Sequence, residues 1–367
     1  MNIIITGSDG FIGRNLSLFL KEQGAHTVVE INKQSCEHET RTALLSADFV
    51  FHLAGVNRPN NDKEFKEGNI DFTRYLISVL RSSGRKIPLM FSSSIQVDVG
   101  NPYGASKAAA EKLVTSYGQE TCSPYFIYRF PNVFGKWCRP NYNSFIATFC
   151  HNILNNLEIT VQDPHSAVTL IYIDDVCNSL VGLLKGNAPV GFGKISPEYE
   201  TTVGYVVELL KKFELTRDNL IVENVGGGLE RALYSTYLSY KSPAQFSYAV
   251  PCYEDDRGAF CEILKTKEAG QFSFFTAHPG VTRGGHYHHT KNEKFLVTQG
   301  HALFRFRQVV TGDYYELKVG GENPRLVETV PGWSHDITNV GSDKLVVMLW
   351  ANEIFDRTAP DTIETLL

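Results

Sequence analysis

A turn rich in glycine follows the first apolar run of the chain, and it constrains the fold more than any other feature. The run Ile3–Ile5 has the length and composition of a buried strand, and Gly7, Gly10 and Gly13 follow it directly. The segment Gly13–Gln23 then repeats apolar residues with a helical period. A strand, a glycine turn and a helix in this order predict a site where free N–H groups at the helix N-terminus hold a diphosphate. The alternative is a turn that needs its glycines for backbone geometry alone.

Strand-length apolar runs and helix-like segments alternate over roughly the first half of the chain. Alternation of this kind is typical of βαβ units, in which the strands are parallel. We therefore predict an α/β domain with a doubly wound, Rossmann-type parallel sheet. The runs are Ile3–Ile5, Thr27–Ile31, Phe49–Leu53, Leu89–Ser92 and Phe126–Phe130.

The character of the sequence changes near Ala244. From there on, short apolar runs recur at regular spacing, and pairs such as Pro279-Gly280 and Pro331-Gly332 separate them. This spacing predicts an antiparallel sandwich or small barrel. We place the boundary so that residues 1–242 and 243–367 form two domains. The expected strands are Phe272–Ala277, Lys294–Thr298, Ala302–Val309, Tyr314–Val319, Arg325–Thr329 and Leu345–Ala351.

Composition and charge exclude several classes of protein. The 367 residues are 43% hydrophobic and 20% charged, and the formal net charge is -5, so neither a disordered chain nor a basic nucleic-acid-binding surface is expected. No apolar run approaches the ~20 residues of a membrane span, and the N-terminus has no signal-peptide pattern. The cysteines are scattered without a C-x-x-C pair, which favours free thiols. We therefore expect a cytoplasmic protein without a nucleic-acid or membrane partner.

The end of the second expected strand indicates which dinucleotide binds. Proteins that bind NAD place an acidic residue there for the ribose 2′-hydroxyl. In this chain Asn32 and Lys33 stand at that position, and Arg14 lies in the loop region. A neutral amide beside cations tolerates a 2′-phosphate, which an acid would repel, so we predict NADPH as the cofactor. If Glu30 marked the strand end instead, NAD would be favoured.

Tyr103 and Lys107 form a Y-x-x-x-K pattern. Residues four apart share one face of a helix, so the ammonium group of Lys107 can stabilise the phenolate of Tyr103 and lower the pKa of this tyrosine. Tyr103 would then be the general acid for a carbonyl that receives a hydride. Ser94, at the end of a strand just upstream, is the expected third member, with Ser93 as second choice. The alternative is an exposed helical pair without a catalytic role.

With these motifs in place, residues 1–185 resemble an extended short-chain dehydrogenase/reductase that acts on nucleotide sugars. Further matching segments are Ala47–Gly55, Arg129–Gly135 and Tyr172–Val176. One departure from the family pattern is that only eight residues separate Ser94 from Tyr103. The substrate pocket is therefore expected either to be more open or to be closed by another part of the chain.

The resemblance implies a set of contacts in this part of the chain. Asp48 would contact adenine, and Asn132 would face the substrate diphosphate. Ser93 and Arg129 are further expected substrate contacts. The expected cofactor contacts are Gly7, Asp9, Gly10, Phe11, Ile12, Gly13, Asn32, Lys33, Asp48, Leu53, Ala54, Gly55, Tyr103 and Lys107.

Histidines and a glutamate at regular spacing predict a metal site in the C-terminal domain. His286 and His288 are two apart, so they project to one face of a strand, and Glu293 and His335 can complete the site from neighbouring strands. Three imidazoles and a carboxylate suit a divalent ion such as Zn²⁺. His289 could replace His288 in a shifted register.

These residues also resemble the two motifs of a cupin barrel. Gly280, His286, His288, Glu293 and Gly300 fit G-x5-H-x-H-x4-E-x6-G, and Pro331-Gly332-Trp333-Ser334-His335 with Asn339 fits P-G-x-x-H-x3-N. One departure is that Arg325 stands upstream of Pro331 where a glycine is usual.

Together with the linker segment Leu233–Tyr240 and the run His289–Val297, the whole chain resembles the bifunctional reductase/epimerase family of bacterial capsule and O-antigen synthesis. This resemblance implies conversion of UDP-2-acetamido-2,6-dideoxy-β-L-arabino-hexos-4-ulose to UDP-2-acetamido-2,6-dideoxy-β-L-talose. The C3 centre would be epimerised in the cupin, and NADPH would then reduce the C4 ketone in the N-terminal domain. A homodimer is expected from the family and from the usual cyclic symmetry of oligomers.

The expected chemistry leaves two points open. A 4-keto group acidifies the neighbouring C3–H, and a metal could stabilise the resulting enolate, but the base that moves the proton could be His289, Tyr287 or Asp336. The alternatives for the whole chain are a reductase with a structural cupin and a non-catalytic nucleotide-sugar sensor. NADPH consumption distinguishes the enzyme from the sensor, and deuterium exchange without NADPH distinguishes an active cupin from a structural one.

Overall fold

The computed structural model describes residues 1–59, 61–250, 252–255, 258–261, 264–266, 270–353, 358–365 and 367. The chain divides into two compact units. The first comprises Met1–Phe134, Cys138–Ser144 and Ala167–Thr201, and the second comprises Gly135–Trp137, Phe145–Ser166 and Thr202–Leu367. Several helices that precede residue 242 thus belong by their contacts to the second unit. The sequence boundary at residue 242 stays a prediction.

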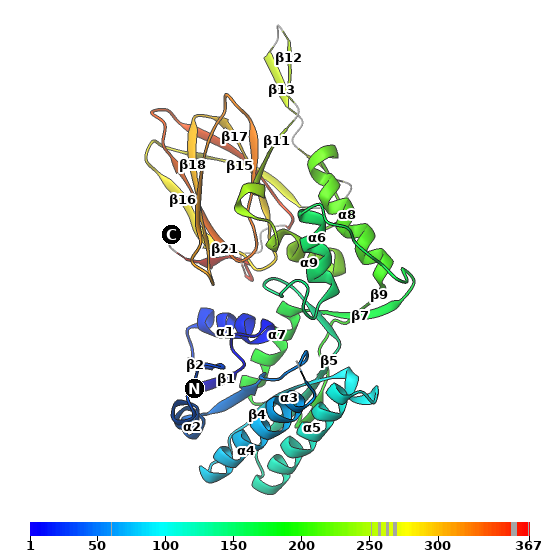
Figure 1. The fold of residues 1–367 in the computed structure, drawn as a ribbon. Coiled ribbons are helices and arrows are strands. Elements are labelled where there is room, and N and C mark those ends of the chain that lie inside the picture. Colours follow the sequence, from blue (N-terminus) through cyan, green and yellow to red (C-terminus); the bar gives the residue numbers. More distant parts are fainter. Residues whose placement is uncertain are drawn as a thin grey trace. The chain divides into compact units, whose positions relative to one another are not determined.

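The first unit is built on a six-stranded sheet with helices on both faces (Figure 1). Its strand order is β2-β1-β3-β4-β5-β8 and its pairings are parallel, which confirms the predicted doubly wound sheet. Helices α1 and α7 pack together, while α2, α4 and α5 form a second packed row. The strands are β1 (Asn2–Thr6), β2 (Thr27–Ile31), β3 (Phe49–His52), β4 (Leu89–Ser94), β5 (Tyr125–Phe130) and β8 (Gly191–Gly193). The helices are α1 (Phe11–Gln23), α2 (Glu37–Ser46), α4 (Phe72–Ser82), α5 (Pro102–Thr121) and α7 (Ile173–Gly182).

The strand order places a ligand crevice at one edge of this sheet. The chain runs from β1 outward to β2 and then returns to the other side of β1 as β3. In open α/β sheets, ligands bind at the carboxyl ends of the strands where the order reverses in this way. The glycine turn after β1 lies at this point. A small second sheet, β6 (Asn132–Phe134), β7 (Ala167–Tyr172) and β9 (Tyr199–Thr202), completes the unit.

The second unit contains two five-stranded sheets, and their pairings are antiparallel, as expected for the cupin barrel. Their strand orders are β11-β20-β17-β22-β15 and β19-β18-β21-β16-β23. Aromatic and branched side chains such as Phe295, Phe304, Trp333 and Val347 form the core of this unit. The strands are β11 (Ser247–Ala249), β15 (Gln271–Ala277), β16 (Thr282–Tyr287), β17 (Glu293–Gln299), β18 (His301–Gln308), β19 (Tyr314–Gly320), β20 (Arg325–Glu328), β21 (Trp333–Asn339), β22 (Leu345–Ala351) and β23 (Ile363–Glu364).

Three helices also belong to the second unit. They are α6 (Phe145–Leu154), α8 (Val203–Asn219) and α9 (Gly228–Ser239), and they contact one another. The expected linker Leu233–Tyr240 is mostly the C-terminal part of α9, and Leu233 and Tyr237 are fully buried. Its sequence of Leu and Tyr therefore serves packing and does not form a linker. Within the part of the chain that the structure describes, no helix combines the length and the hydropathy needed to cross a membrane.

Candidate functional site

The glycine turn has the geometry of a phosphate-binding loop. Gly7 has φ +73°, and a Cβ there would lie 2.7 Å from the Ala54 Cα. A Cβ on Gly13 would lie 2.2 Å from the Gly7 carbonyl oxygen, so α1 can approach the turn only without a side chain. Gly10 is the N-cap of α1, and no side chain among the described residues caps this helix. The N–H groups of the first turn can therefore hold a diphosphate, which fits a dinucleotide.

The residue that follows β2 is Asn32, as the NADPH prediction requires. The Gly7 N–H donates to the Ile31 carbonyl at 2.8 Å, so the glycine turn lies beside the end of β2. Glu30 lies inside β2, and its carboxylate accepts a hydrogen bond from Lys21 at 2.7 Å. Because Glu30 is already paired with α1, it does not mark the strand end. Asn32 and the exposed Lys33 remain the predicted contacts for a 2′-phosphate.

The predicted adenine contact of Asp48 is wrong. Asp48 precedes β3, at the amino-terminal edge of the sheet, whereas the glycine turn lies at the carboxyl edge. Its carboxylate accepts hydrogen bonds from the Asn2 N–H and from Arg85, each at 2.8 Å. The other end of the same motif is placed as expected. Leu53 and Ala54 follow β3 at the carboxyl edge, where the Leu53 N–H donates to the Thr6 carbonyl at 3.2 Å.

Ser94, Tyr103 and Lys107 come together at the same edge of the sheet. Ser94 ends β4, and its side chain is hydrogen-bonded to Tyr103 in the first turn of α5. Asn101 caps this helix by accepting from the Gly104 N–H at 2.7 Å, which fixes where α5 begins. Lys107, one turn further on, is 4% exposed and donates to the Ser92 carbonyl at 2.9 Å.

Electrostatics at this group differ from the expectation in one respect. Burial raises the pKa of Tyr103 above its ordinary value, and the hydrogen bond with Ser94 opposes this. The Lys107 ammonium group donates one hydrogen bond to the Ser92 carbonyl at 2.9 Å, and its stabilisation of the Tyr103 phenolate stays a prediction. Burial lowers the pKa of Lys107 to about 8, although the nearby Glu111 carboxylate favours the charged form. Tyr103 is therefore a protonated acid near neutral pH.

Gly55 connects the two halves of this site. A Cβ at Gly55 would lie 2.9 Å from the Lys107 Nζ and 3.0 Å from the Asn69 Oδ1. Since Ala54 touches Gly7 and Gly55 touches Lys107, the short segment after β3 joins the glycine turn to the Y-x-x-x-K pair. A cofactor diphosphate on the turn and a reacting group at Tyr103 would thus lie along one edge of one sheet.

A cavity of about 210 Å³ opens beside Tyr103. Phe65 forms one of its walls, with its ring centroid 5.9 Å from that of Tyr103. Phe65 directly precedes the π-helix η1 (Lys66–Asp71), and buried Asn69 ties η1 to the Val56 backbone at 2.7 and 2.9 Å. The residues around the cavity are Asn57, Phe65, Gln96, Asn101, Pro102, Tyr103 and Asn143.

Residues from outside the segment between Ser94 and Tyr103, namely Asn57, Phe65 and Asn143, also line this cavity. Both expectations, a more open pocket and one closed by another part of the chain, stay predictions. Except for Tyr103, these lining residues were not predicted. The π-helix, often a mark of a functional site, has no sequence signature that we could use.

Two expected substrate residues are instead held by Glu111. Ser93 donates to the Glu111 carboxylate at 2.5 Å, and Arg129 binds it through two nitrogens at 2.9 and 2.8 Å. Ser93 and Arg129 are also partners across β4 and β5. These bonds join α5 to the sheet, and the contacts of Ser93 and Arg129 with a substrate stay predictions. Asn132 is exposed at the start of β6, and its contact with a diphosphate stays a prediction.

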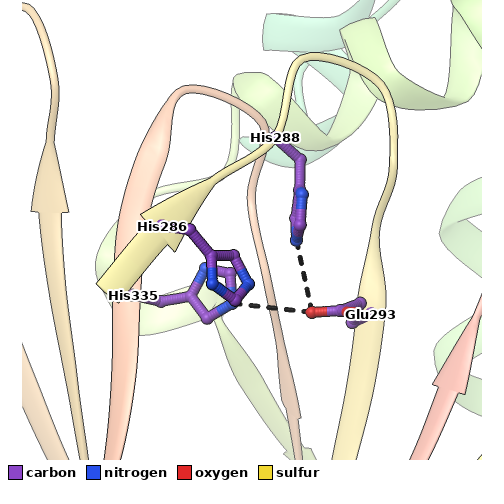
Figure 2. A group of neighbouring side chains, drawn as sticks. All are labelled: His286, His288, Glu293 and His335. Carbon is purple, nitrogen blue, oxygen red and sulfur yellow. Dashed lines mark hydrogen bonds and ion pairs between the residues drawn. The ribbon is translucent and has the colours of Figure 1, made fainter. Parts of the chain in front are cut away.

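His286, His288, Glu293 and His335 converge in the second unit (Figure 2). One ligand atom from each lies within 4.8 Å of the others. His286 is the penultimate residue of β16, Glu293 begins β17, and His335 lies on β21. His288 lies in the connection between β16 and β17. All but His286 are buried. The expected ligand set is brought together in the predicted register, with His288 and not His289 in the cluster.

The donor atoms of this cluster fit a cation. The His288 Nδ1–H donates to the Asp361 carbonyl at 2.5 Å, so the Nε2 of a neutral His288 carries a lone pair. That Nε2 lies 3.3 Å from the Glu293 Oε2, and the His335 Nε2 lies 3.5 Å from the same oxygen. Burial lowers the pKa of His286 to about 3 and also lowers the pKa of His335, which keeps both imidazoles neutral. Imidazole lone pairs and a carboxylate repel one another at these distances. A divalent ion such as Zn²⁺ bound by both would remove this repulsion.

Two of the three expected bases, Tyr287 and Asp336, directly follow cluster residues on their strands and so project to the opposite face. Tyr287 alternates with His286 and His288, and its ring lies 5.5 Å from that of His289. Asp336 follows His335 on β21 and forms a two-point ion pair with Arg305 at 2.8 and 2.6 Å. A side chain that the sequence analysis missed is Lys291, whose Nζ lies 2.9 Å from the Glu293 Oε1. Another is Asp361, which no motif singles out.

Comparison with known proteins places the chain in a family. The model of the NAD dependent epimerase/dehydratase family matches residues 3–191. The chain belongs to this family. A second model, the polysaccharide biosynthesis C-terminal domain, matches residues 253–363.

Relatives within this family match the whole chain. A UDP-2-acetamido-2,6-beta-L-arabino-hexul-4-ose reductase of Pseudomonas aeruginosa is 52% identical over 363 residues, which cover 99% of this chain and 98% of the relative. The crystal structure of the capsular polysaccharide assembling protein CapF from Staphylococcus aureus matches with a TM-score of 0.69 and 41% identity, covering 100% of both chains. The resemblance to the capsule reductase/epimerase family is thereby confirmed. A UDP-glucuronic acid 4-epimerase from Bacillus cereus, 20% identical with a TM-score of 0.53 over 58% of this chain and 82% of that chain, shares the fold.

Proposed function

We propose that this epimerase/dehydratase-family chain is a bifunctional nucleotide-sugar enzyme. It epimerises C3 of UDP-2-acetamido-2,6-dideoxy-β-L-arabino-hexos-4-ulose and then reduces the C4 ketone to give UDP-2-acetamido-2,6-dideoxy-β-L-talose for capsule or O-antigen synthesis. The observation that carries the proposal is the cavity beside Tyr103, in a chain 52% identical to a 4-keto sugar reductase over its whole length. A homodimer in the cytoplasm is part of the same proposal.

The reductase site supplies a proton and holds the ketone. NADPH, when bound, supplies the hydride for C4. Tyr103 donates its phenolic proton to the ketone oxygen, which balances the hydride and gives the alcohol and NADP⁺. Ser94, hydrogen-bonded to Tyr103, can donate a second hydrogen bond to the same oxygen and so orient the carbonyl. The ammonium group of Lys107 adds a positive charge beside the site where negative charge develops.

The cupin site suits the preceding proton exchange. A divalent ion held by His286, His288, Glu293 and His335 would act as a Lewis acid toward the C4 ketone. The C3–H beside that ketone is acidic, so a base on the cupin can remove the proton and return it to the other face. The four residues that would hold the ion lie on or next to β16, β17 and β21, and neutral imidazoles would preserve its charge. Reduction removes the ketone, so epimerisation must come first.

The product distinguishes this proposal from the two alternatives. We would incubate the 4-keto UDP-sugar with the full-length chain, with and without NADPH, and determine the product by NMR. The proposal predicts a C3-inverted alcohol with NADPH and C3 exchange without it. An alcohol of unchanged C3 configuration would indicate a reductase with a structural cupin. Binding of the nucleotide sugar without turnover would indicate a sensor.

A further inference from the structure

The last described segment of the chain, residues 358–365, contacts the loop that carries the metal ligands. Asp361 lies at its centre. Its carboxylate accepts four hydrogen bonds: from the His289 N–H at 2.8 Å, from the Thr290 N–H and hydroxyl at 2.6 and 2.9 Å, and from the Lys291 N–H at 2.7 Å. A carboxylate bound to consecutive backbone N–H groups fixes the path of a turn, because each bond is charge-assisted.

The same residue orients a ligand. The Asp361 carbonyl accepts the His288 Nδ1–H, which holds the imidazole with Nε2 toward Glu293. A second hydrogen bond of this kind sets the tautomer and ring orientation of a histidine ligand in metalloproteins. Asp361 thus makes two kinds of contact. Its carboxylate binds N–H groups of the loop backbone, and its main-chain carbonyl binds the imidazole of the ligand His288.

The rest of the segment contacts the strands that carry the other two histidines. β23 pairs with β16, where Glu364 lies opposite His286 and Ile363 lies opposite Tyr287. The Thr365 N–H donates to the Gly285 carbonyl at 2.8 Å, and its carbonyl accepts from the Ser334 hydroxyl at 2.8 Å. Ser334 directly precedes His335. The segment therefore contacts the main chain on either side of the histidine cluster.

The loop has a second support that does not involve this segment. The Thr290 carbonyl accepts a hydrogen bond from Ser235 of α9 at 2.8 Å, and Arg231 of α9 donates to the Thr290 hydroxyl. Loss of Asp361 would therefore leave the loop attached to α9. What it would remove is the carboxylate that binds three N–H groups of the loop, and with it the support that holds the main-chain carbonyl of residue 361 in place against His288.

We propose that residues 358–365 are a C-terminal clamp of the metal centre, in which Asp361 is a positioning residue for His288. The inference rests on the proposed function, because it requires the His/Glu cluster to bind a metal. The clamp sets the affinity for the ion and the geometry of the ligands. Metal binding is therefore linked to the packing of residues 358–365 against the ligand loop. Each of these two processes stabilises the other by the same free energy.

The test compares Zn²⁺ binding by the full-length wild type, Asp361→Ala and Glu364→Gln. Glu364 is the matched control, because it is an exposed carboxylate on the same segment. Zn²⁺ affinity is measured by competition with a chelator of known affinity. We expect a loss of about 10–100-fold for Asp361→Ala, the usual range for disturbing the partner that orients a ligand, because the carbonyl that accepts from His288 is then no longer held in place. We expect no change for Glu364→Gln. Equal affinity in all three proteins would overturn the inference.

A spectroscopic measurement separates positioning from general stability. With Co²⁺ in place of Zn²⁺, the visible absorption bands of the ion report the ligand geometry. The proposal predicts a changed spectrum for Asp361→Asn, even where the metal-free melting temperature equals that of the wild type. A lower melting temperature with an unchanged spectrum and an unchanged Zn²⁺ affinity would overturn it.

Two further outcomes remain decisive. If Asp361→Ala does not fold, Thr290→Val takes its place and is compared with Arg231→Met. Thr290→Val deletes the hydroxyl that bonds both Asp361 and Arg231, whereas Arg231→Met removes only the second of these bonds. A several-fold loss of Zn²⁺ affinity in Thr290→Val beyond that of Arg231→Met then supports the clamp, and equal affinities of these two variants contradict it. If the wild-type chain itself binds no Zn²⁺, both the proposed metal centre and the clamp are wrong. If the wild type binds Zn²⁺ and Asp361→Ala binds it equally tightly, only the clamp is wrong.

Discussion

The hydroxyl of Tyr103 is hydrogen-bonded to Ser94, and Tyr103 lines the cavity of about 210 Å³. Tyr103→Phe deletes this hydroxyl and leaves the glycine turn intact. We expect ketone reduction to fall by about 100-fold or more, the range of general-acid effects. The affinity for NADPH, measured by fluorescence titration, should stay within about twofold. Tyr75→Phe, outside the cavity, is the control, and near-normal turnover of Tyr103→Phe would show that the motif is accidental.

The pKa of Lys107 predicts a pH dependence. Burial lowers this pKa to about 8, and the Glu111 carboxylate partly opposes the shift. Because the ammonium form assists the reaction, kcat/KM should fall as the pH rises through about 8. Glu111→Gln removes a neighbouring anion, which lowers the lysine pKa further, so the falling limb should move to lower pH. Asp98→Asn, an exposed acid beside the same Arg129, is the control. If kcat/KM of Glu111→Gln falls at the same pH as that of the wild type, the falling limb does not report the titration of Lys107.

Asn32 carries the predicted preference for NADPH. Asn32→Asp places a carboxylate where the 2′-phosphate is expected, and repulsion should shift the ratio of kcat/KM toward NADH by about tenfold or more. Steady-state rates with both cofactors measure this ratio. A wild type that already uses NADH as well as NADPH would refute the preference, whatever the variant does.

At the scale of elements, the turn between β1 and α1 requires glycine at one position above all. A Cβ at Gly13 would lie 2.2 Å from the Gly7 carbonyl oxygen. Gly13→Ala should therefore displace α1, weaken NADPH binding and cost about 1–3 kcal/mol of stability, as overpacking does. Gly182→Ala in α7 is the control, because nothing lies near its Cβ position and a helix favours alanine. Urea unfolding measures both, and an equally stable Gly13→Ala would contradict the close packing.

The sequence predicts elements well where local patterns determine them, and badly where distant segments meet. Apolar runs identified β1 and β17, and residue spacing identified the histidine cluster, because periods of two and four residues are local properties. Asp48 was misplaced because a motif does not show at which edge of the sheet each of its ends lies. Phe65 and Asp361 could not be found, since each reaches its site through contacts between segments far apart in the chain.

At the scale of the whole molecule, the proposed function divides one reaction sequence between two units. Tyr103 and its partners all lie in the first unit, and the four metal ligands all lie in the second. The named residues of each site thus come from a single unit. The two half-reactions should therefore be separable by single substitutions, because the shared requirement is only the 4-keto sugar.

The most direct test is deuterium exchange at C3 of the 4-keto UDP-sugar in D₂O without NADPH, followed by NMR. The wild type and Tyr103→Phe should incorporate deuterium at similar rates, since this substitution does not touch the His/Glu cluster. His335→Ala removes one ligand and should abolish exchange, while it still oxidises NADPH on the unepimerised ketone. If His335→Ala exchanges deuterium at the wild-type rate, the metal site has no part in catalysis and the two-site account is wrong.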